Sequence, residues 1–354
     1  MRVAIIAHDR HPIAEPFAGG LESFVWHLTR GLRLRGLDVT VFAGPGSDPS
    51  LGVEELRVDP VQLSTLARAD VSMPAERVVQ GTFAYLGCMQ QIARRGDIDI
   101  VHNNSLHYLP IALSELLPVP VLTNLHTPPT PWIEPPLREL GDAAHVVAVS
   151  AAVAKQWEGI VTPRVIHNGV DLTKWTYGEG GSDLVWVGRV VPEKAPHLAA
   201  MAARLANRRL RIAGPLSDVA YFEDVLRPLL DDRITYVGHL HPGELMTLVG
   251  SSAVNLVTPM WEEPFGLVAP EAMACGTPVV ALARGGLVEI VAPPGGVLVS
   301  ASGDEQQTVD ALAEALSRAE ALPRREVRRY AETRFDLAAV VDRYIAFYEE
   351  LASA

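Results

Sequence analysis

Short apolar runs alternate with longer amphipathic segments along almost the whole chain. Runs of this kind, rich in Val, Ile and Leu, predict buried strands, and the segments between them predict helices. Their alternation is typical of βα units, which build parallel sheets covered by helices. We predict twelve strands, at Arg2–Ala7, Asp38–Ala43, Ile98–His102, Val119–Thr123, His145–Val149, Arg164–Ile166, Asp183–Val187, Leu210–Ala213, Ile234–Val237, Val254–Val257, Pro278–Leu282 and Gly296–Val299.

The number of units favours two domains over one. An eight-stranded α/β barrel needs about eight units, and one hydrophobic core rarely grows beyond ~250–300 residues, whereas this chain has 354. The glycine-rich segment Asn168–Ser182 separates two equal series of strands. We therefore expect an α/β fold of two Rossmann-like, doubly wound domains at residues 1–168 and 169–336. Apolar residues at helical spacing predict a packed terminal helix within 337–354.

Charge and composition exclude several classes of partner. Lysine and arginine total 30 against 42 aspartates and glutamates, and a net charge of −12 is unsuited to a nonspecific nucleic-acid binder. Cys88 and Cys275 are too few for a disulfide framework or a cysteine metal site. No apolar stretch approaches the ~18–20 residues of a membrane span, and no export signal precedes the first strand. We expect a cytoplasmic protein without stable membrane insertion.

Polar residues follow several of the predicted strands. In open α/β sheets, ligands bind beyond the carboxyl ends of the strands. His8, His102, Asn103 and His126 hold such positions in the first half, and Gly188-Arg189 follows the first strand of the second half. A single histidine at a strand end usually just bonds neighbouring backbone, so position alone assigns no function.

A pair of glycines, Gly19-Gly20, precedes the first amphipathic helix. Glycines at this place let backbone N–H groups approach an anion, which the start of a helix attracts. The alternative is a loop that needs a positive φ angle, which glycine adopts without strain. The six-residue glycine fingerprint of dinucleotide-binding enzymes is missing after the first strand.

Two cations stand five residues apart in the loop after the seventh predicted strand. Arg189 and Lys194 lie between that strand and a helix that begins near Pro196. A diphosphate carries about two negative charges, so two converging cations could neutralise it. The alternative is a solvated charged loop, although lysine is scarce in this chain.

The stretch from Trp261 to Gly276 carries the strongest signal. Glu263 and Glu271 flank a loop and the predicted start of a helix near Leu267. Carboxylates accept hydrogen bonds from vicinal hydroxyls, and free amides at a helix start bind phosphate or sugar oxygens. Glutamate near a helix start is also favourable for the helix dipole alone.

Taken in order, these residues resemble the family 4 retaining glycosyltransferases, which have the GT-B architecture of two Rossmann-like domains facing across a cleft. The resemblance spans nearly the whole chain. Its motifs are Gly19-Gly20-x-Glu22, His126, Asn168-Gly169-Val170-Asp171, Gly188-Arg189, Glu193-Lys194, the pair Glu263 and Glu271, and Gly285-Gly286 with Glu289.

The resemblance implies a nucleotide-diphosphate sugar, linked to uridine or guanosine, in the second domain. Arg189 and Lys194 would bind its diphosphate, and Glu271 its ribose. The resemblance also implies that other residues contact the transferred sugar and the phosphates. These are His126 beside the reacting carbon, Glu263 with the amides of Phe265, Gly266, Leu267 and Val268 on the sugar, and Gly19 and Gly20 near the phosphates.

By the same resemblance, the hexosyl unit passes with retention to a hydroxyl of a small-molecule or saccharide acceptor held by the first domain. No metal or other cofactor is expected, and the terminal helix packs back on the first domain. Asp97-Ile98-Asp99 has the D-x-D spacing of metal-dependent glycosyltransferases. These acids stand at the entry of a strand, away from the expected site, so we interpret the match as accidental.

Other functions of the same fold stay open. A nucleotide-sugar epimerase, a phosphorylase-like protein or a non-catalytic nucleotide-sugar-binding protein would share the two domains. A phosphorylase needs a lysine-bound pyridoxal phosphate, for which none of Lys155, Lys174 and Lys194 is an evident candidate.

Overall fold

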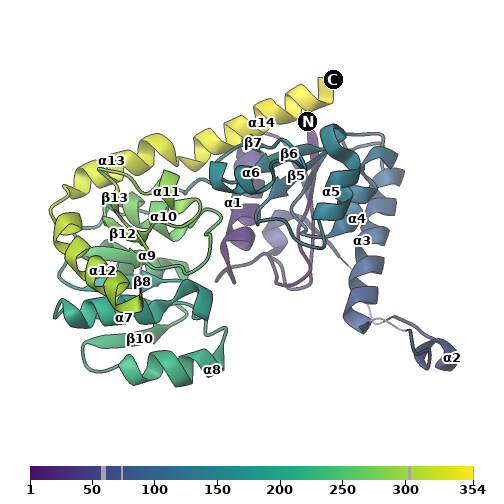
Figure 1. Cartoon of the computed structure of the whole chain (residues 1–354). Helices are drawn as coiled ribbons and strands as arrows, with labels where there is room; N and C mark the ends of the chain where they lie inside the picture. Colours follow the sequence, from purple (N-terminus) through teal and green to yellow (C-terminus); the bar gives the residue numbers. More distant parts are fainter. Residues whose placement is uncertain (57–60, 73–74, 302–303, 354) are drawn as a thin grey trace.

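The structure is a computed structural model that describes residues 1–56, 61–72, 75–301 and 304–353. It contains one seven-stranded and one six-stranded sheet, and every strand pairs in parallel with its neighbours. Figure 1 shows the two sheets in separate lobes, with the end of the chain running across both. The predicted α/β fold of two Rossmann-like domains is confirmed.

The first sheet has the order β3-β2-β1-β4-β5-β6-β7. Val3 and Ile5 of its central strand pack toward one face, and Ala4 and Ile6 toward the other, because side chains alternate along a strand. Its strands are β1 (Arg2–Ile6), β2 (Asp38–Ala43), β3 (Val53–Glu55), β4 (Ile100–Asn103), β5 (Val121–Leu125), β6 (His145–Ala148) and β7 (Arg164–Val165).

The edge strand β3 is missing from the twelve predictions. Only three residues long, it reads Val-Glu-Glu, so it has neither the length nor the apolar content of a buried strand. It pairs with β2 through Val53, Glu54 and Glu55. Strand β4 also begins at Ile100 rather than Ile98.

The second sheet has the order β10-β9-β8-β11-β12-β13. All six strands coincide with predicted runs to within one residue. They are β8 (Leu184–Val187), β9 (Leu210–Ala213), β10 (Ile234–Gly238), β11 (Val254–Val257), β12 (Val279–Leu282) and β13 (Gly296–Val299).

Helices cover both faces of each sheet. In the first domain α1 and α14 cover one face, and α3 covers the other. In the second domain α7 and α12 lie on one face, opposite α10 and α13. The helices are α1 (Gly20–Leu34), α2 (Thr65–Arg68), α3 (Glu76–Arg94), α4 (Tyr108–Ala112), α5 (Glu134–Leu140), α6 (Ala151–Gln156), α7 (Pro196–Leu205), α8 (Val219–Tyr221), α9 (Pro242–Gly250), α10 (Val268–Ala274), α11 (Leu287–Ile290), α12 (Glu305–Glu320), α13 (Arg324–Arg334) and α14 (Leu337–Ser353).

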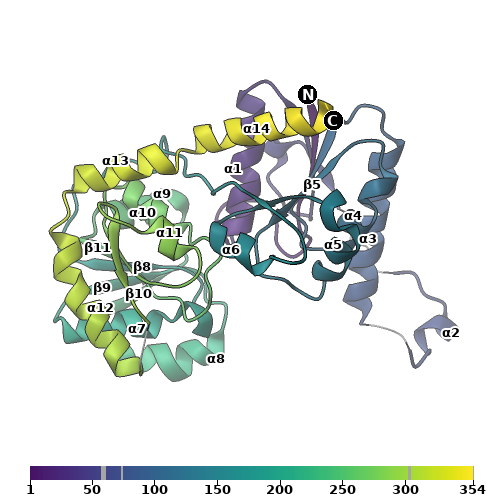
Figure 2. The same cartoon turned by 45° about the horizontal axis from the view of Figure 1, so that its top comes forward.

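The terminal helix α14 returns to the first domain and lies beside α1 (Figure 2). Its Tyr344 hydroxyl bonds the side chain of Asn124 at 3.0 Å, and its Tyr348 hydroxyl bonds His102 Nδ1 at 2.7 Å. All four side chains are buried, so α14 is part of the core of the first domain. This is the packing that the resemblance implies.

The chain crosses between the domains twice, and the two crossings lie side by side. Val170 donates its amide to the carbonyl of Phe335 at 2.7 Å, and Leu337 donates to the carbonyl of Val170 at 3.1 Å. A Cβ atom on Gly169 would stand 2.6 Å from the Leu337 Cα, which is too close for any side chain. Glycine at 169 therefore lets the two crossings pack backbone to backbone.

Candidate active site

A cleft of about 470 Å³ lies between the two domains and takes its walls from both. Ligands of open α/β folds bind at the carboxyl ends of the strands, where the residues predicted above stand. The structure places all of these residues on the cleft walls: Gly19, Gly20, His126, Arg189, Lys194, Glu263, Phe265, Gly266, Leu267, Val268 and Glu271.

Two other strand-end residues are absent from the cleft lining. His102 is fully buried under α14, where Tyr348 bonds it. Asn103 bonds Thr123 and Ser105 within the first domain. Their position after a strand therefore reflects packing.

The Gly19-Gly20 pair begins α1 at the edge of the cleft. Gly19 has a φ of −168°, an extended conformation that any residue adopts, so the alternative of a positive φ is wrong. A Cβ atom on Gly20 would instead lie 3.3 Å from the Leu267 side chain of the second domain. The absence of side chains at this point lets the start of α1 approach the opposite wall.

Lys194 forms an ion pair with Glu263 across the second-domain wall. Lys194 ends a short 3₁₀ turn before α7, and its Nζ lies 2.5 Å from Glu263 Oε2. The Trp261 indole N–H donates to the same oxygen at 3.0 Å. The sequence predicted both charged residues in the site but not their pairing, since 69 positions separate them.

Arg189 lies at the same wall, directly after β8. Its guanidinium is 3.5 Å from Glu193 Oε1, and its side chain keeps 43% of its surface exposed. Exposed pairs of this kind contribute roughly 0–1 kcal/mol. Arg189 is thus loosely held, and its donors stay available to an anion in the cleft.

Glu271 lies in the first turn of α10 and faces the cleft. Burial raises the pKa of its carboxyl group to about 8, since the surrounding protein disfavours the charged form. Among the described residues, no side chain pairs with this carboxyl group. Glu271 is therefore an unpaired acid whose raised pKa favours the protonated form at neutral pH.

The loop before α10 presents backbone amides to the cleft. Within the part of the chain that the structure describes, no protein acceptor bonds the amides of Phe265, Gly266 and Leu267. Gly266 has a φ of +81°, which turns the chain here. Buried N–H groups normally have partners, so this loop is suited to oxygen atoms of a ligand.

His126 stands on the opposite wall, after β5, and is 9% exposed. Its Nε2 lies 2.8 Å from Asn104 Oδ1, while the Asn104 amide group donates to the His102 carbonyl. Nε2 must therefore carry the hydrogen, which leaves Nδ1 as an acceptor. Burial, with smaller effects from His102 and His8, lowers the pKa of His126 to about 3, so the ring is neutral.

A second polar pair on the first-domain wall was not assigned from the sequence. His8 Nδ1 accepts from the Arg10 amide at 3.0 Å, so its Nε2 donates to Glu22 Oε1 at 2.8 Å. Burial has the largest single effect and raises the pKa of Glu22, but the hydrogen bond from His8 and several smaller interactions together leave the pKa below its usual value. The Gly19-Gly20-x-Glu22 motif included Glu22, but the sequence did not predict its partner His8, which follows a different element.

Glu289 connects the second domain to the first. It lies in α11, yet its carboxylate accepts from the amides of Ala151 and Ala152 at the start of α6, each at 3.1 Å. His167 Nε2 lies 2.8 Å from the same carboxylate. This residue closes the Gly285-Gly286-x-x-Glu289 motif, and its contacts hold the two walls together.

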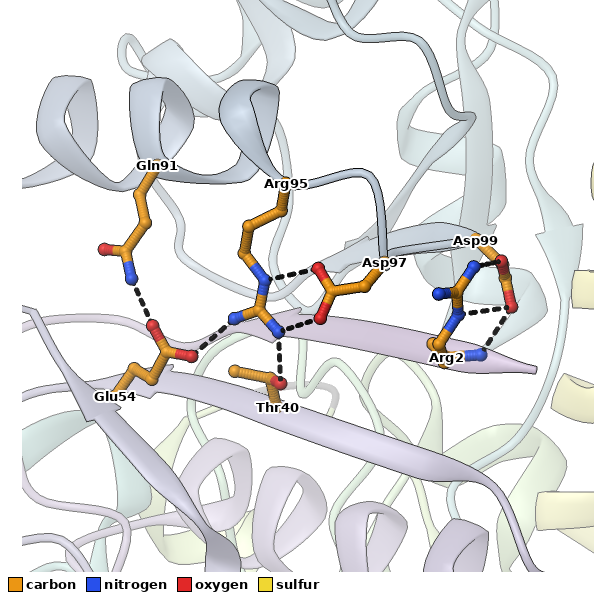
Figure 3. Close-up of polar contacts among 7 residues, drawn as sticks. All are labelled: Arg2, Thr40, Glu54, Gln91, Arg95, Asp97 and Asp99. Atoms are coloured by element: carbon orange, nitrogen blue, oxygen red, sulfur yellow. Dashed lines mark hydrogen bonds and ion pairs between the residues drawn. The ribbon is translucent and has the colours of Figure 1, made fainter.

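The D-x-D acids lie at the opposite end of the first sheet. Arg95 binds Asp97 and Glu54, and Arg2 binds Asp99 (Figure 3). Hydrogen bonds from these arginines lower the pKa of both aspartates. Both carboxylates therefore have structural partners, in agreement with the interpretation of the motif as accidental.

Comparisons with known proteins agree with this geometry. The family model described as Glycosyltransferase Family 4 matches residues 18–174, and the model described as Glycosyl transferases group 1 matches residues 173–334. A D-inositol 3-phosphate glycosyltransferase of Mycolicibacterium smegmatis is 30% identical over 407 aligned positions, which cover 99% of this chain and 92% of the relative. The chain belongs to the family 4 glycosyltransferases.

Solved structures of other proteins share the fold of this family 4 member. A sucrose-phosphate synthase from Thermosynechococcus elongatus has a TM-score of 0.78 and 22% identity, covering 99% of both chains. The Anabaena protein HepE in complex with UDP-glucose has a TM-score of 0.75 and 19% identity, covering 99% of this chain and 100% of that one. The GT-B architecture is thereby shown. Among the helices described for this glycosyltransferase, none has the length and apolarity that crossing a membrane requires.

Proposed function

We propose that this glycosyltransferase transfers a hexosyl unit, with retention and without metal, from a UDP-linked sugar to a hydroxyl of a saccharide or small-molecule acceptor. The observation that carries the proposal is the second-domain wall, where Arg189, Lys194 and Glu271 face one cleft. In this proposal the diphosphate binds between Arg189 and Lys194, and the ribose of the same nucleotide binds Glu271. The HepE structure was obtained with UDP-glucose, which favours uridine over guanosine.

The two cations supply the charge that a departing diphosphate needs. Groups fixed where negative charge develops make the largest contribution in many enzymes, because they need no reorganisation during the reaction. Lys194 can share its three N–H donors between Glu263 and a phosphate oxygen. Arg189 adds a second charge from the same wall, which is why we propose a reaction without metal.

The state of the acids in the cleft argues against a covalent intermediate on the protein. Glu15 pairs with Lys174, Glu22 bonds His8, Glu263 pairs with Lys194, and we assign Glu271 to the ribose of the donor. No described carboxylate in the lining is therefore both charged and free to attack the sugar. A reaction on one face, in which a donor phosphate oxygen takes the proton of the acceptor, fits this arrangement.

His126 completes the proposed site from the first domain. Because its ring is neutral, His126 cannot donate a charge-assisted hydrogen bond to the leaving group. Its free Nδ1 can accept a hydrogen bond from a sugar hydroxyl, and Asn104 fixes the ring in place. We assign it to orienting the transferred sugar.

A transfer assay tests the proposal. The enzyme is incubated with UDP-glucose, UDP-galactose or GDP-mannose and a panel of saccharides in the presence of EDTA, and nucleotide release and the anomeric configuration of the product are measured. Acceptor-dependent UDP release with an axial product is expected. An inverted product would contradict retention, and full loss of activity with EDTA would contradict metal independence. Conversion of the donor sugar without an acceptor would contradict transfer and identify an epimerase.

A further inference from the structure

Lys174, on the cleft wall, contacts two parts of the first domain at once. Its Nζ lies 2.9 Å from Glu15 Oε1, and the same ammonium group lies 4.2 Å from the centre of the Trp26 ring. Glu15 stands in the loop four positions before Gly19. Trp26 belongs to α1, six positions after Gly20. One cation therefore holds the chain on both sides of the glycine pair.

The backbone at Lys174 is anchored to the second domain. The guanidinium group of Arg328, in α13, donates to the carbonyls of Leu172 and Trp175. The amides of Lys174 and Trp175 both donate to the Asp171 carbonyl, at 3.1 and 2.9 Å, which closes a turn. Lys174 therefore extends from a fixed turn on the second domain to its partners in the first.

The two partners of Lys174 are themselves well defined. Trp26 is buried, and its indole N–H donates to Asp48 Oδ2 at 2.9 Å, which fixes the ring that attracts the cation. Glu15 bonds no other side chain among the described residues. His27 also experiences the charge of Glu15, but burial lowers its pKa to about 4, so its ring is neutral. Lys174 is therefore the cation that pairs with this acid.

The segment that Lys174 holds is the one that meets the opposite wall. A Cβ atom on Gly20 would lie 3.3 Å from Leu267 Cδ1, so the start of α1 packs against the loop that presents its amides to the cleft. The first N–H groups of a helix have no intrahelical partner and attract negative charge. A shift of this segment would move these groups away from an anion bound in the cleft.

We propose that Lys174 is a positioning residue for the nucleotide donor. Through Glu15 and Trp26 it holds the start of α1 against the second-domain wall, where the diphosphate binds. Lys174 does not itself contact the diphosphate, because its ammonium group already has a carboxylate and a ring as partners. This inference rests on the proposed function, since it names a residue that supports the same donor site.

Calorimetry with UDP and uridine on a double-mutant cycle tests this role. Lys174→Met removes the charge and keeps the length of the side chain, and it weakens UDP binding by roughly threefold to tenfold, the range for an ion pair with a cation–π contact. Glu15→Gln weakens UDP binding in the same direction, and the double variant loses little more than Lys174→Met alone, because both changes break one contact. Lys174→Arg keeps most of the affinity, since arginine retains the charge and also binds aromatic faces. The Kd for uridine is unchanged throughout.

The sign of the Glu15→Gln effect separates positioning from simple charge. This variant removes a negative charge from the cleft wall, so electrostatics alone predicts tighter UDP binding. Tighter binding would overturn the positioning role of Lys174. An unchanged Kd for UDP in Lys174→Met, or equal weakening of UDP and uridine, would overturn it as well.

Arg30→Met is the matched control. Arg30 lies over the same Trp26 ring at 4.4 Å, but Glu15 pairs with Lys174 instead. Its removal takes a cation from the ring without releasing the loop, so the Kd for UDP stays unchanged.

Hydrogen exchange separates this inference from the proposed function. Without nucleotide, the amides of residues 20–26 exchange roughly threefold or more faster in Lys174→Met and Glu15→Gln than in the wild type, and at the wild-type rate in Arg30→Met. Unchanged exchange in Lys174→Met overturns the positioning role. Failure of the wild type to bind UDP contradicts the proposed function instead, and the exchange rates still report on Lys174.

Discussion

The wall of the cleft from the second domain carries two cations, whereas the wall from the first combines two neutral histidines with Arg10, Glu15 and Glu22. Arg189 and Lys194 stand on the former. On the latter, burial lowers the pKa of His27 to about 4 and that of His126 to about 3. The difference suits a reaction in which negative charge develops on the departing diphosphate and the transferred sugar needs positioning. We propose that the second-domain wall stabilises the charge of the diphosphate and that the first-domain wall orients the sugar.

Removing a charge from the second-domain wall should have the largest effect. Lys194→Ala is expected to lower kcat/KM by roughly 10²–10³-fold, the usual loss when one group that stabilises developing charge is removed. Steady-state UDP release measures it. Lys155→Ala removes an exposed lysine of α6 and should leave the rate within about twofold. A Lys194→Ala enzyme that stays folded with an unchanged rate would remove the basis of the assignment.

Removing the orienting ring from the first-domain wall should act on turnover. His126→Ala is expected to lower kcat by roughly tenfold to a hundredfold through misplacement of the sugar, with little change in the Kd for UDP. Initial rates and calorimetry separate the two quantities. His145→Ala, at the exposed start of β6, is the control. A weaker Kd with normal kcat would place His126 in donor binding instead.

The protonated acid on the charged wall predicts a pH dependence. Glu271 binds the ribose hydroxyls best as a carboxylate, but burial raises its pKa to about 8. Donor binding must then release a proton below pH 8, so the Kd for UDP-glucose should fall by up to about tenfold per pH unit as the pH rises from 6 to 8. Glu271→Gln should remove this slope. A wild-type Kd that is flat with pH contradicts the ribose assignment.

A substitution where the chain crosses between the two domains should have the smallest effect. Gly169→Ala forces a methyl group against Leu337, and overpacking of this kind costs roughly 1–3 kcal/mol of unfolding free energy. Gly87→Ala, in α3 with open space around it, should instead stabilise the protein by roughly 0.5–1 kcal/mol. Chemical denaturation compares them. Equal stabilities of the two variants would show that the crossings separate easily.

The sequence predicted the second-domain wall better than the first. Arg189, Lys194, Glu263 and Glu271 come from two short segments, so their order along the chain already carried the signal. The partners of His8 and His126 arise from other elements, and the contact of Glu289 with Ala151 spans 138 positions. Such contacts depend on how the domains pack, which residue spacing does not encode. The same holds for β3, which forms a strand because it pairs with β2, although two of its three residues are glutamates.

A comparison of UDP with uridine tests the charged wall most directly. Calorimetry gives both dissociation constants for the wild type and for a variant carrying Arg189→Ala and Lys194→Ala together. Two charged contacts at roughly 1.5 kcal/mol or more each predict that the wild type prefers UDP by about a hundredfold or more, and that the double variant loses most of this preference. An undiminished preference for UDP in the folded double variant would show that the diphosphate binds elsewhere.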